Sequence, residues 1–82
     1  MKESELLKDL KEHIGNTAKH KNSQVTANSI YFMFKQYSVS IDNKRVYGDL
    51  LKEIKKYLSV DFGWSMVEIH ACFCKLSELL KY

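Results

Sequence analysis

The stretch NKRVYGDLLKEIKKYL, residues 43–58, places an apolar residue at every third or fourth position. At about 100° per residue, its apolar side chains fall on one arc of a helix and its charges on the other. The pattern predicts an amphipathic helix from about Asn43 to Leu58 with one buried face. The opposite face carries five cations, with Asp49 and Glu53 pushed toward its edge. These cations are Lys44, Arg45, Lys52, Lys55 and Lys56.

The N-terminal half of the chain is harder to interpret. A leucine stripe followed by the stop signal Gly15-Asn16 predicts a first helix from Ser4 to Ile14. Residues Asn16 to Asn28 are polar and lack a periodic apolar face, which predicts a loop. Thr26 is the expected N-cap of a further helix from about Ala27 to Tyr37. The aromatic and β-branched residues there would also allow a strand, so the helix is favoured but the choice stays open.

The last helix has the clearest start signal. Ser65-Met66-Val67-Glu68 is a capping-box sequence, which predicts that the helix begins at Ser65 or Met66. Trp64 and Ile69 occupy the positions of a hydrophobic staple. Beside its main apolar stripe, this helix carries a narrower second one on the opposite side, made of Val67, Ala71 and Cys74. A helix that is apolar on two sides needs two neighbours, either two elements of its own chain or one element and the same helix of a second subunit.

These patterns predict a mainly α fold, a small domain of three to four helices that comprises residues 1–82. The composition, 45% hydrophobic and 28% charged without proline, is typical of an ordinary globular domain. Residues 26–58 resemble a helix-turn-helix in a generic way, with a winged-helix variant or a short β-hairpin near 37–47 as alternatives. The connection is longer than the usual tight turn and has no glycine, which counts against the motif.

The sequence argues against a membrane or secreted protein. Its longest uninterrupted apolar run, Ile30 to Phe34, is far shorter than the roughly 20 residues of a membrane helix. The N-terminal residues alternate charge with leucine and lack the apolar centre of a secretion signal. Cys72 and Cys74, two positions apart on a helix, point in different directions and cannot pair, so both are expected to be free thiols. We therefore expect a cytoplasmic protein in a reducing compartment.

The chain offers little for catalysis or metal binding. His70, Cys72 and Cys74 would share one side only in an extended strand, whereas the surrounding pattern is helical and a fourth ligand is not evident. His13, His20 and His70 are scattered along the sequence, and the chain lacks a Ser-His-Asp pattern, paired-carboxylate spacing and a glycine-rich phosphate loop. We expect no enzyme, no metal site and no cofactor. Cys72 is expected to pack as a small hydrophobic residue.

Charge distribution suggests a nucleic-acid partner. The net charge of +3 is concentrated in residues 13–60, which hold eight Lys or Arg against three acids. Gly48 interrupts the basic face of the 43–58 helix, and a missing side chain there would let a phosphate backbone approach closely. The first hypothesis is a regulator that contacts nucleic-acid phosphates with weak sequence preference, and the alternative is a solvated face with weak ion pairs. The expected contact residues are Lys19, Lys21, Lys44, Arg45, Lys52, Lys55 and Lys56.

The second hypothesis is a protein-binding regulator or inhibitor that docks a basic and aromatic surface on an acidic partner. Ten aromatic residues in 82 give a large supply of the side chains that interface cores use. Phe62 and Trp64, which flank Gly63, could be exposed anchors, although they could equally close the core. A homodimer through the C-terminal helix would use its second stripe. The expected partner-binding residues are Phe62, Trp64, Val67, Ala71 and Cys74.

Overall fold

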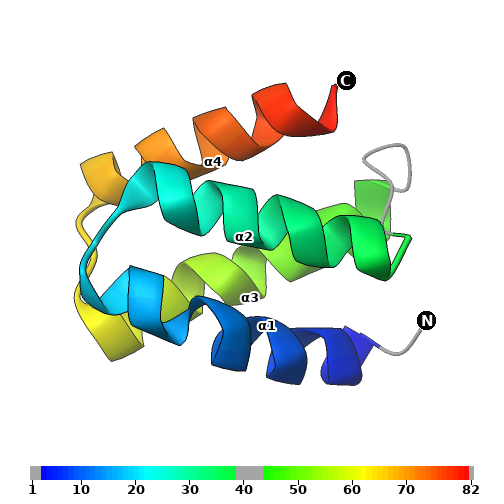
Figure 1. The fold of residues 1–82 in the computed structure, drawn as a ribbon, viewed down its shortest axis with the longest axis horizontal. Coiled ribbons are helices and arrows are strands. Elements are labelled where there is room, and N and C mark those ends of the chain that lie inside the picture. Colours follow the sequence, from blue (N-terminus) through cyan, green and yellow to red (C-terminus); the bar gives the residue numbers. More distant parts are fainter. Residues whose placement is uncertain (1–2, 39–43, 82) are drawn as a thin grey trace.

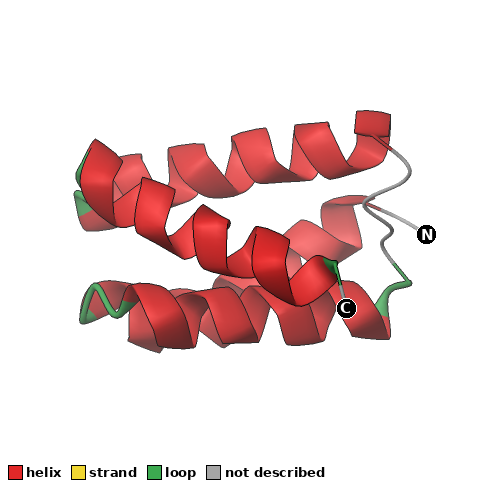
Figure 2. Cartoon of the chain, turned by 90° about the horizontal axis from the view of Figure 1, so that it is seen from above, coloured by secondary structure: helices red, strands yellow, loops and turns green. Residues whose placement is uncertain are grey.

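The computed structural model describes residues 3–38 and 44–81, and in these two ranges it consists of helices and turns with no strand (Figures 1 and 2). The mainly α class predicted from the sequence is therefore confirmed. The four helices are α1 (Glu3–Lys19), α2 (Ser23–Gln36), α3 (Lys44–Phe62) and α4 (Met66–Leu80).

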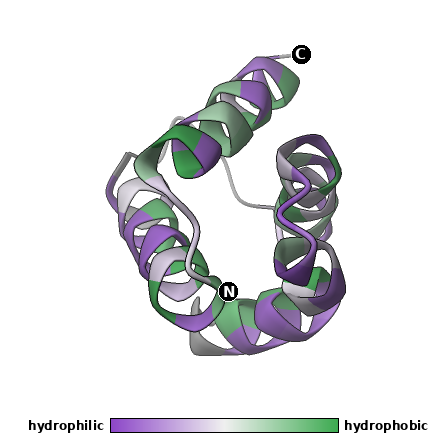
Figure 3. Ribbon diagram, turned by 90° about the vertical axis from the view of Figure 1, so that its left-hand side faces the viewer, coloured by the Kyte–Doolittle hydropathy of each residue, from purple (hydrophilic) through white to green (hydrophobic). Residues whose placement is uncertain are grey.

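Helix α2 lies at the centre of the packing. It packs against both α1 and α4, while α1 also packs against α3. Among the neighbouring pairs, α3 and α4 are in the least close contact. Figure 3 looks along the helices and shows them arranged around a shared interior. The turn between α1 and α2 and the turn between α3 and α4 lie at the same end of the molecule (Figure 1).

The apolar stripes predicted from the sequence form the core. Each of α1, α3 and α4 turns its stripe inward, and α2 adds aliphatic and aromatic residues. Burial of this kind is the main favourable contribution to folding. The buried residues include Leu6, Leu10 and Ile14 of α1, Ile30, Met33 and Phe34 of α2, Leu50, Ile54 and Leu58 of α3, and Ile69, Cys72, Phe73 and Leu76 of α4.

The loop predicted over residues 16–28 is wrong. Gly15 and Asn16 do not end α1, which continues to Lys19, and α2 already begins at Ser23. Within residues 16–28 the fully buried residues are small: Ala18, Thr26 and Ala27. Small side chains let the two helices approach closely but give little hydropathy signal in the sequence.

Two threonines complete the contact between α1 and α2. The Thr26 hydroxyl donates a hydrogen bond of 3.2 Å to the Thr17 hydroxyl, which in turn donates to the Ile14 carbonyl at 3.0 Å. Thr26 is fully buried inside α2 and is not its N-cap, contrary to the prediction. Asn22 caps the helix instead, because its side chain accepts from the backbone N–H of Val25 at 3.1 Å.

The turn between α1 and α2 is a tight helix C-cap. The backbone N–H of Lys21 donates to the Ala18 carbonyl at 3.0 Å, and that of Asn22 donates to the Thr17 carbonyl at 3.3 Å. This pair of bonds is the Schellman arrangement, which needs one residue in the left-handed region. Lys21 takes that position with φ of 55°.

The ambiguous segment around residues 27–37 is helical, in agreement with the favoured interpretation. A β-hairpin near 37–47 is not seen, since residues 44–47 belong to α3 and residues 37–38 form a turn after α2. Residues 39–43 of the expected connection lie outside the described ranges. The helix-turn-helix or winged-helix identity is therefore not confirmed.

The connection from α3 to α4 is defined by two capping motifs. Helix α3 runs four residues beyond the predicted end at Leu58, and Gly63, with φ of 65°, terminates it by donating to the Ser59 carbonyl at 3.1 Å. Ser65 then caps α4, which begins at Met66 as predicted. The capping box is confirmed: the Ser65 N–H donates to Glu68 Oε1 at 2.9 Å, and the Glu68 N–H donates to Ser65 Oγ at 3.3 Å.

Tyrosine hydroxyls add polar links between helices. The Tyr37 hydroxyl donates to the carboxylate of Asp9, and this hydrogen bond is the main reason that the pKa of Tyr37 is raised. The Tyr57 hydroxyl of α3 donates to the Lys11 carbonyl of α1 at 3.2 Å. None of the helices in the described part of the chain is long and apolar enough to cross a membrane.

Candidate binding surface on α3 and α4

The cations of α3 form one exposed surface. Because Leu50, Ile54 and Leu58 turn inward, the opposite side of α3 faces solvent. From Arg45 to Lys56 this surface extends about 16 Å along the helix axis, at 1.5 Å per residue. The side chain of Lys44 lies outside the described part of the structure. We call the remaining four exposed side chains the α3 basic strip: Arg45, Lys52, Lys55 and Lys56.

Among the described residues, the strip forms no ion pair with a carboxylate of its own helix. Asp49 and Glu53 are exposed on α3, yet among the residues that the structure describes they form no ion pair with the strip. The weak ion pairs considered from the sequence are thus not formed. Lys55 instead directs its ammonium group over the ring of Phe73 in α4, 5.4 Å from the ring centroid.

Gly48 lies on the exposed side of α3, between Arg45 and Lys52 in sequence. A Cβ atom added there would have no neighbour within 4 Å apart from the helix itself. Packing therefore does not require glycine, although glycine in a helix interior costs about 0.8 to 1 kcal/mol relative to alanine. The missing side chain leaves the helix backbone open next to the basic strip.

Lys19 and Lys21 are exposed at the end of α1 and in the turn that follows. This turn lies at the end of the molecule opposite to the start of α3 (Figure 1). Lys21 is close enough to Glu68 to help lower the pKa of that carboxyl, although the hydrogen bonds from Ser65 lower it more. The two lysines thus lie near the start of α4, and they extend the positive surface only around the end of the bundle.

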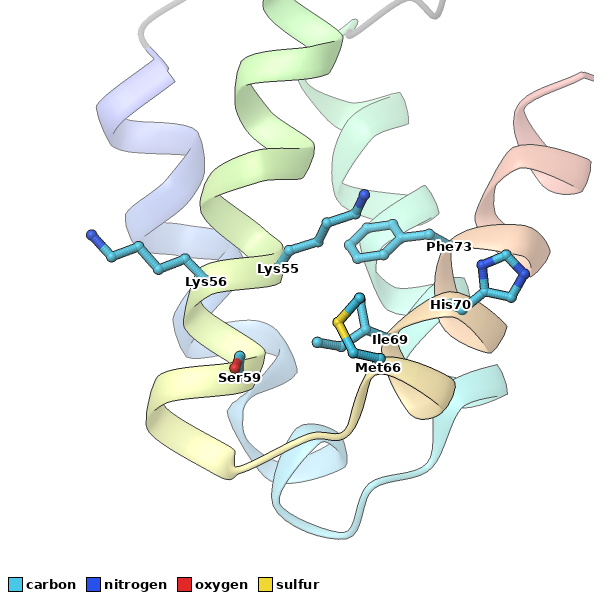
Figure 4. A pocket seen from close by; sticks show the side chains of 7 residues that line it. All are labelled: Lys55, Lys56, Ser59, Met66, Ile69, His70 and Phe73. Carbon is cyan, nitrogen blue, oxygen red and sulfur yellow. The ribbon is translucent and has the colours of Figure 1, made fainter.

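A groove runs along the surface between α3 and α4 beside the basic strip. One part encloses about 310 Å³, and a second part, which shares Lys55, His70 and Phe73 with the first, encloses about 450 Å³ toward the end of α4. We call the two parts together the α3–α4 groove, and Figure 4 shows the lining of the first part. The first part is lined by Lys55, Lys56, Ser59, Met66, Ile69, His70 and Phe73. The second part adds Leu51, Cys74, Ser77, Glu78 and Lys81.

The aromatic pair before α4 belongs to the interior. Trp64 is only 4% exposed, and its indole Nε1–H donates to the Ala18 carbonyl of α1 at 2.8 Å. Phe62 is half-buried, with its ring edge-on to Tyr57 and the ring centroids 5.2 Å apart. Trp64 therefore closes the core, as the alternative interpretation of the sequence expected, and it offers no exposed anchor to a partner.

The second stripe of α4 is exposed. Val67 has 78% of its surface exposed, and Ala71 and Cys74 are exposed as well. Sequence reasoning missed Met66, the first residue of α4, which is 83% exposed and lines the groove. Met66 was not part of either predicted stripe, although it lies three residues before Ile69 and seven before Phe73 and so falls at the edge of the main stripe. This spacing was the signal that could have identified it.

The two thiols are free, as predicted, and have opposite environments. Cys72 is fully buried, and burial raises its pKa to about 12. Cys74 is exposed, with Sγ 3.3 Å from His70 Nε2 one helical turn away. Because residues 70–74 are helical, the three potential ligands do not converge, and the described residues contain no group of three or more that could hold a metal ion.

The fold and this surface define a four-helix protein with an exposed cationic helix face beside a partly apolar groove. Comparison of the chain with protein-family models, with curated proteins and with solved structures finds no match.

Proposed function

We propose that this protein is a non-enzymatic regulator that binds nucleic acid by contacting the phosphate backbone through the α3 basic strip. The observation that carries the proposal is the set of four exposed cations on one helix face, which form no ion pair with the described residues. Cations that have no ion-pair partner and share one helix face can bind phosphate oxygens. This binding releases the counterions that surround a nucleic acid. Gly48 would allow the backbone of α3 to come close to a phosphate.

Helix α3 would enter or lie across a groove of the duplex in the way a recognition helix does. The major groove of B-form DNA, about 12 Å wide, admits an α-helix. The strip holds Arg45 as its best base-contacting side chain and offers neither Asn nor Gln to read adenine. Contacts would thus be mainly to phosphates, and preference between sequences would be weak.

The test is fluorescence-anisotropy titration of labelled duplex and single-stranded DNA at two salt concentrations. With four phosphate contacts, the logarithm of the binding constant should fall with the logarithm of salt concentration with a slope of about −3.6. A triple variant with Lys52→Gln, Lys55→Gln and Lys56→Gln should bind weakly to every sequence, with a slope of about −0.9.

A second triple variant serves as the charge-matched control. Lys8→Gln, Lys35→Gln and Lys81→Gln remove the same charge from exposed positions on α1, on α2 and after α4. This control should keep the salt slope of the unmodified protein, because none of its changes touches the strip. No binding at low salt, or equal losses in the two triple variants, would contradict the proposal.

The second candidate is a protein-binding regulator that docks on an acidic partner. One observation favours it: Lys55 and Lys56 of the basic strip also border the α3–α4 groove, where Met66 exposes a large apolar side chain. Cations next to an apolar recess are typical of surfaces that bind amphipathic segments of other proteins. A homodimer through Val67, Ala71 and Cys74 would be a further protein interface on the same helix.

A further inference from the structure

The floor of the α3–α4 groove is apolar and incompletely covered. Met66 projects from the first turn of α4 and is 83% exposed, and Ile69 and Phe73 each keep 8% of their surface accessible. Figure 4 shows Met66, Ile69 and Phe73 extending from α4 toward α3. An exposed apolar surface of this kind costs free energy in water, which is regained when a partner covers it.

The edges of the groove are mainly cationic. Lys55 reaches across from α3 over the Phe73 ring, whereas Lys56 points to the outer side of α3 (Figure 4). Lys81 lines the far end, and Glu78 is the one carboxylate among the described lining residues. Three lysines against one glutamate give the lining a net positive charge, so a partner with carboxylates along its sides is electrostatically complementary.

The protein's own surface does not offer a matching face. Its large exposed apolar side chains in the described ranges are scattered over three helices, and the apolar stripes of α1 and α3 are already buried in the core. A second copy would bring to the groove only the narrow stripe of Val67, Ala71 and Cys74, of which Cys74 already lines the groove of its own chain. Those scattered residues are Val25, Phe32, Val60, Met66 and Val67.

We propose that the α3–α4 groove binds an acidic amphipathic helix of another protein. Apolar residues of the bound helix would cover Met66 and the exposed edges of Ile69 and Phe73, while its glutamates and aspartates would pair with Lys55 and Lys81. From Met66 to Lys81 the groove runs along about 22 Å of α4, which matches a helix of roughly 15 residues at 1.5 Å per residue.

Nucleic acid and the acidic helix would bind partly different residues. Arg45 and Lys52 belong to the basic strip but do not line the groove, whereas Met66 lines the groove and lies outside the strip. Because Lys55 belongs to the basic strip and also reaches into the groove, a bound acidic helix would compete with nucleic acid for it. The groove thus also supplies a way to regulate the function proposed above.

The test uses a synthetic acidic peptide of about 15 residues, with leucines at positions spaced three and four apart and glutamates at most others. Its matched control has the same composition in an order that destroys the helical spacing. Binding of the fluorescently labelled peptides to the full chain is followed by anisotropy. The ordered peptide should bind at least about tenfold more tightly than the control peptide, since only its apolar residues share one face.

Two neighbouring substitutions on α4 locate the site. Met66→Glu places a carboxylate in the groove, and Val67→Glu places the same charge on the adjacent exposed residue outside the lining. Met66→Glu should weaken binding of the ordered peptide about tenfold or more, as loss of a central apolar contact does, and Val67→Glu should leave it within about twofold. Circular dichroism of both variants verifies that the helices are retained.

A second readout uses the native thiol in the groove lining. Bound peptide should slow alkylation of Cys74, while Cys72 is buried and unreactive in either state. Lys52→Gln should weaken DNA binding and leave peptide binding unchanged, so a failure of one proposal can be told from a failure of the other. Equal binding of the two peptides, equal losses in Met66→Glu and Val67→Glu, or the absence of binding would each overturn the groove assignment.

Discussion

Two cysteines only two positions apart have opposite chemistry because a helix turns neighbouring side chains to different sides. Cys72 points into the core between α4 and the rest of the bundle, and Cys74 points to solvent beside His70. The sequence was sufficient to predict both free thiols and the packing of Cys72, since helical spacing alone rules out a bond between them. Cys74 and His70 come into contact because they are four residues apart, which places them on the same side of the helix.

Burial of Cys72 should make stability depend on alkaline pH. The folded pKa is raised to about 12 from an ordinary value of 9.0, so as pH rises the unfolded chain loses its thiol proton first. The contribution of the buried thiol to the free energy of unfolding should therefore be fully present below about pH 8. The free energy of unfolding should then decrease as the pH rises from about 8 to about 10. Urea unfolding at several pH values measures this dependence.

Cys72→Ala is the matched variant for this prediction. It lacks the buried thiol, so its stability should decline less steeply over the same pH range, even if the smaller side chain lowers stability at every pH. Tyrosines also begin to titrate near pH 10, which sets the upper limit of the useful range. Parallel pH dependences in the two proteins would show that the Cys72 thiol is not protected from ionisation.

The burial of Trp64 could not be predicted from its neighbours in the sequence. Its neighbours along the chain allowed either an exposed anchor or a core residue, and the choice is made by the Ala18 carbonyl, 46 residues away. A contact at such separation depends on how α1 meets the turn between α3 and α4. The local sequence around Trp64 does not specify how α1 packs against this turn.

At the scale of helices, the sequence succeeded where apolar residues are large and failed where they are small. The stripes of α3 and α4 and the capping box at Ser65 were readable, because leucine, isoleucine and a capping pair give strong periodic signals. The sequence predicts a loop at the junction of α1 and α2, because the residues buried there, Ala18, Thr26 and Ala27, are small or polar. Threonine and alanine count as weakly apolar in any pattern, yet they suit a close helix crossing.

Gly48 offers a test of why α3 carries a glycine. Gly48→Ala should stabilise the protein by about 0.8 to 1 kcal/mol, since alanine is the better helix former and its Cβ meets nothing within 4 Å. Chemical unfolding of the variant measures this gain. If α3 binds phosphates closely at this point, the same variant should bind DNA more weakly despite being more stable.

The comparison with Gly15→Ala isolates the effect of position. Gly15 is also inside a helix, and a Cβ there would make only an ordinary contact with the Tyr57 hydroxyl at 3.9 Å. That variant should gain similar stability and keep its DNA affinity, because it lies on α1. Unchanged DNA binding by Gly48→Ala would remove Gly48 from the proposed contact surface.

For the molecule as a whole, the sequence predicted the helices but not their partners. Four amphipathic helices can be arranged in several ways, and the stripes alone do not say that α2 packs against both α1 and α4 or that α3 and α4 are in the least close contact. The α3–α4 groove is a product of that arrangement. It brings Lys55 of one helix to Phe73 of another, a contact that no local pattern signals.

The central position of α2 should appear in its backbone dynamics. Amides of α2 around Ile30, Met33 and Phe34 should exchange most slowly with deuterium, because opening them disrupts contacts with two neighbouring helices. Amides of α4 should exchange faster, since this helix relies mainly on α2. Hydrogen exchange followed by mass spectrometry measures both, and slower exchange in α4 than in α2 would contradict this hierarchy.

The hydrogen bond from Trp64 to Ala18 gives the protein a built-in optical reporter. The chain has a single tryptophan, and it is buried where the end of α1 meets the turn before α4. Its emission should shift to longer wavelength as soon as that junction opens to water. Because Trp64 does not line the α3–α4 groove, the same signal can show that a variant with altered binding is still folded, without any added label.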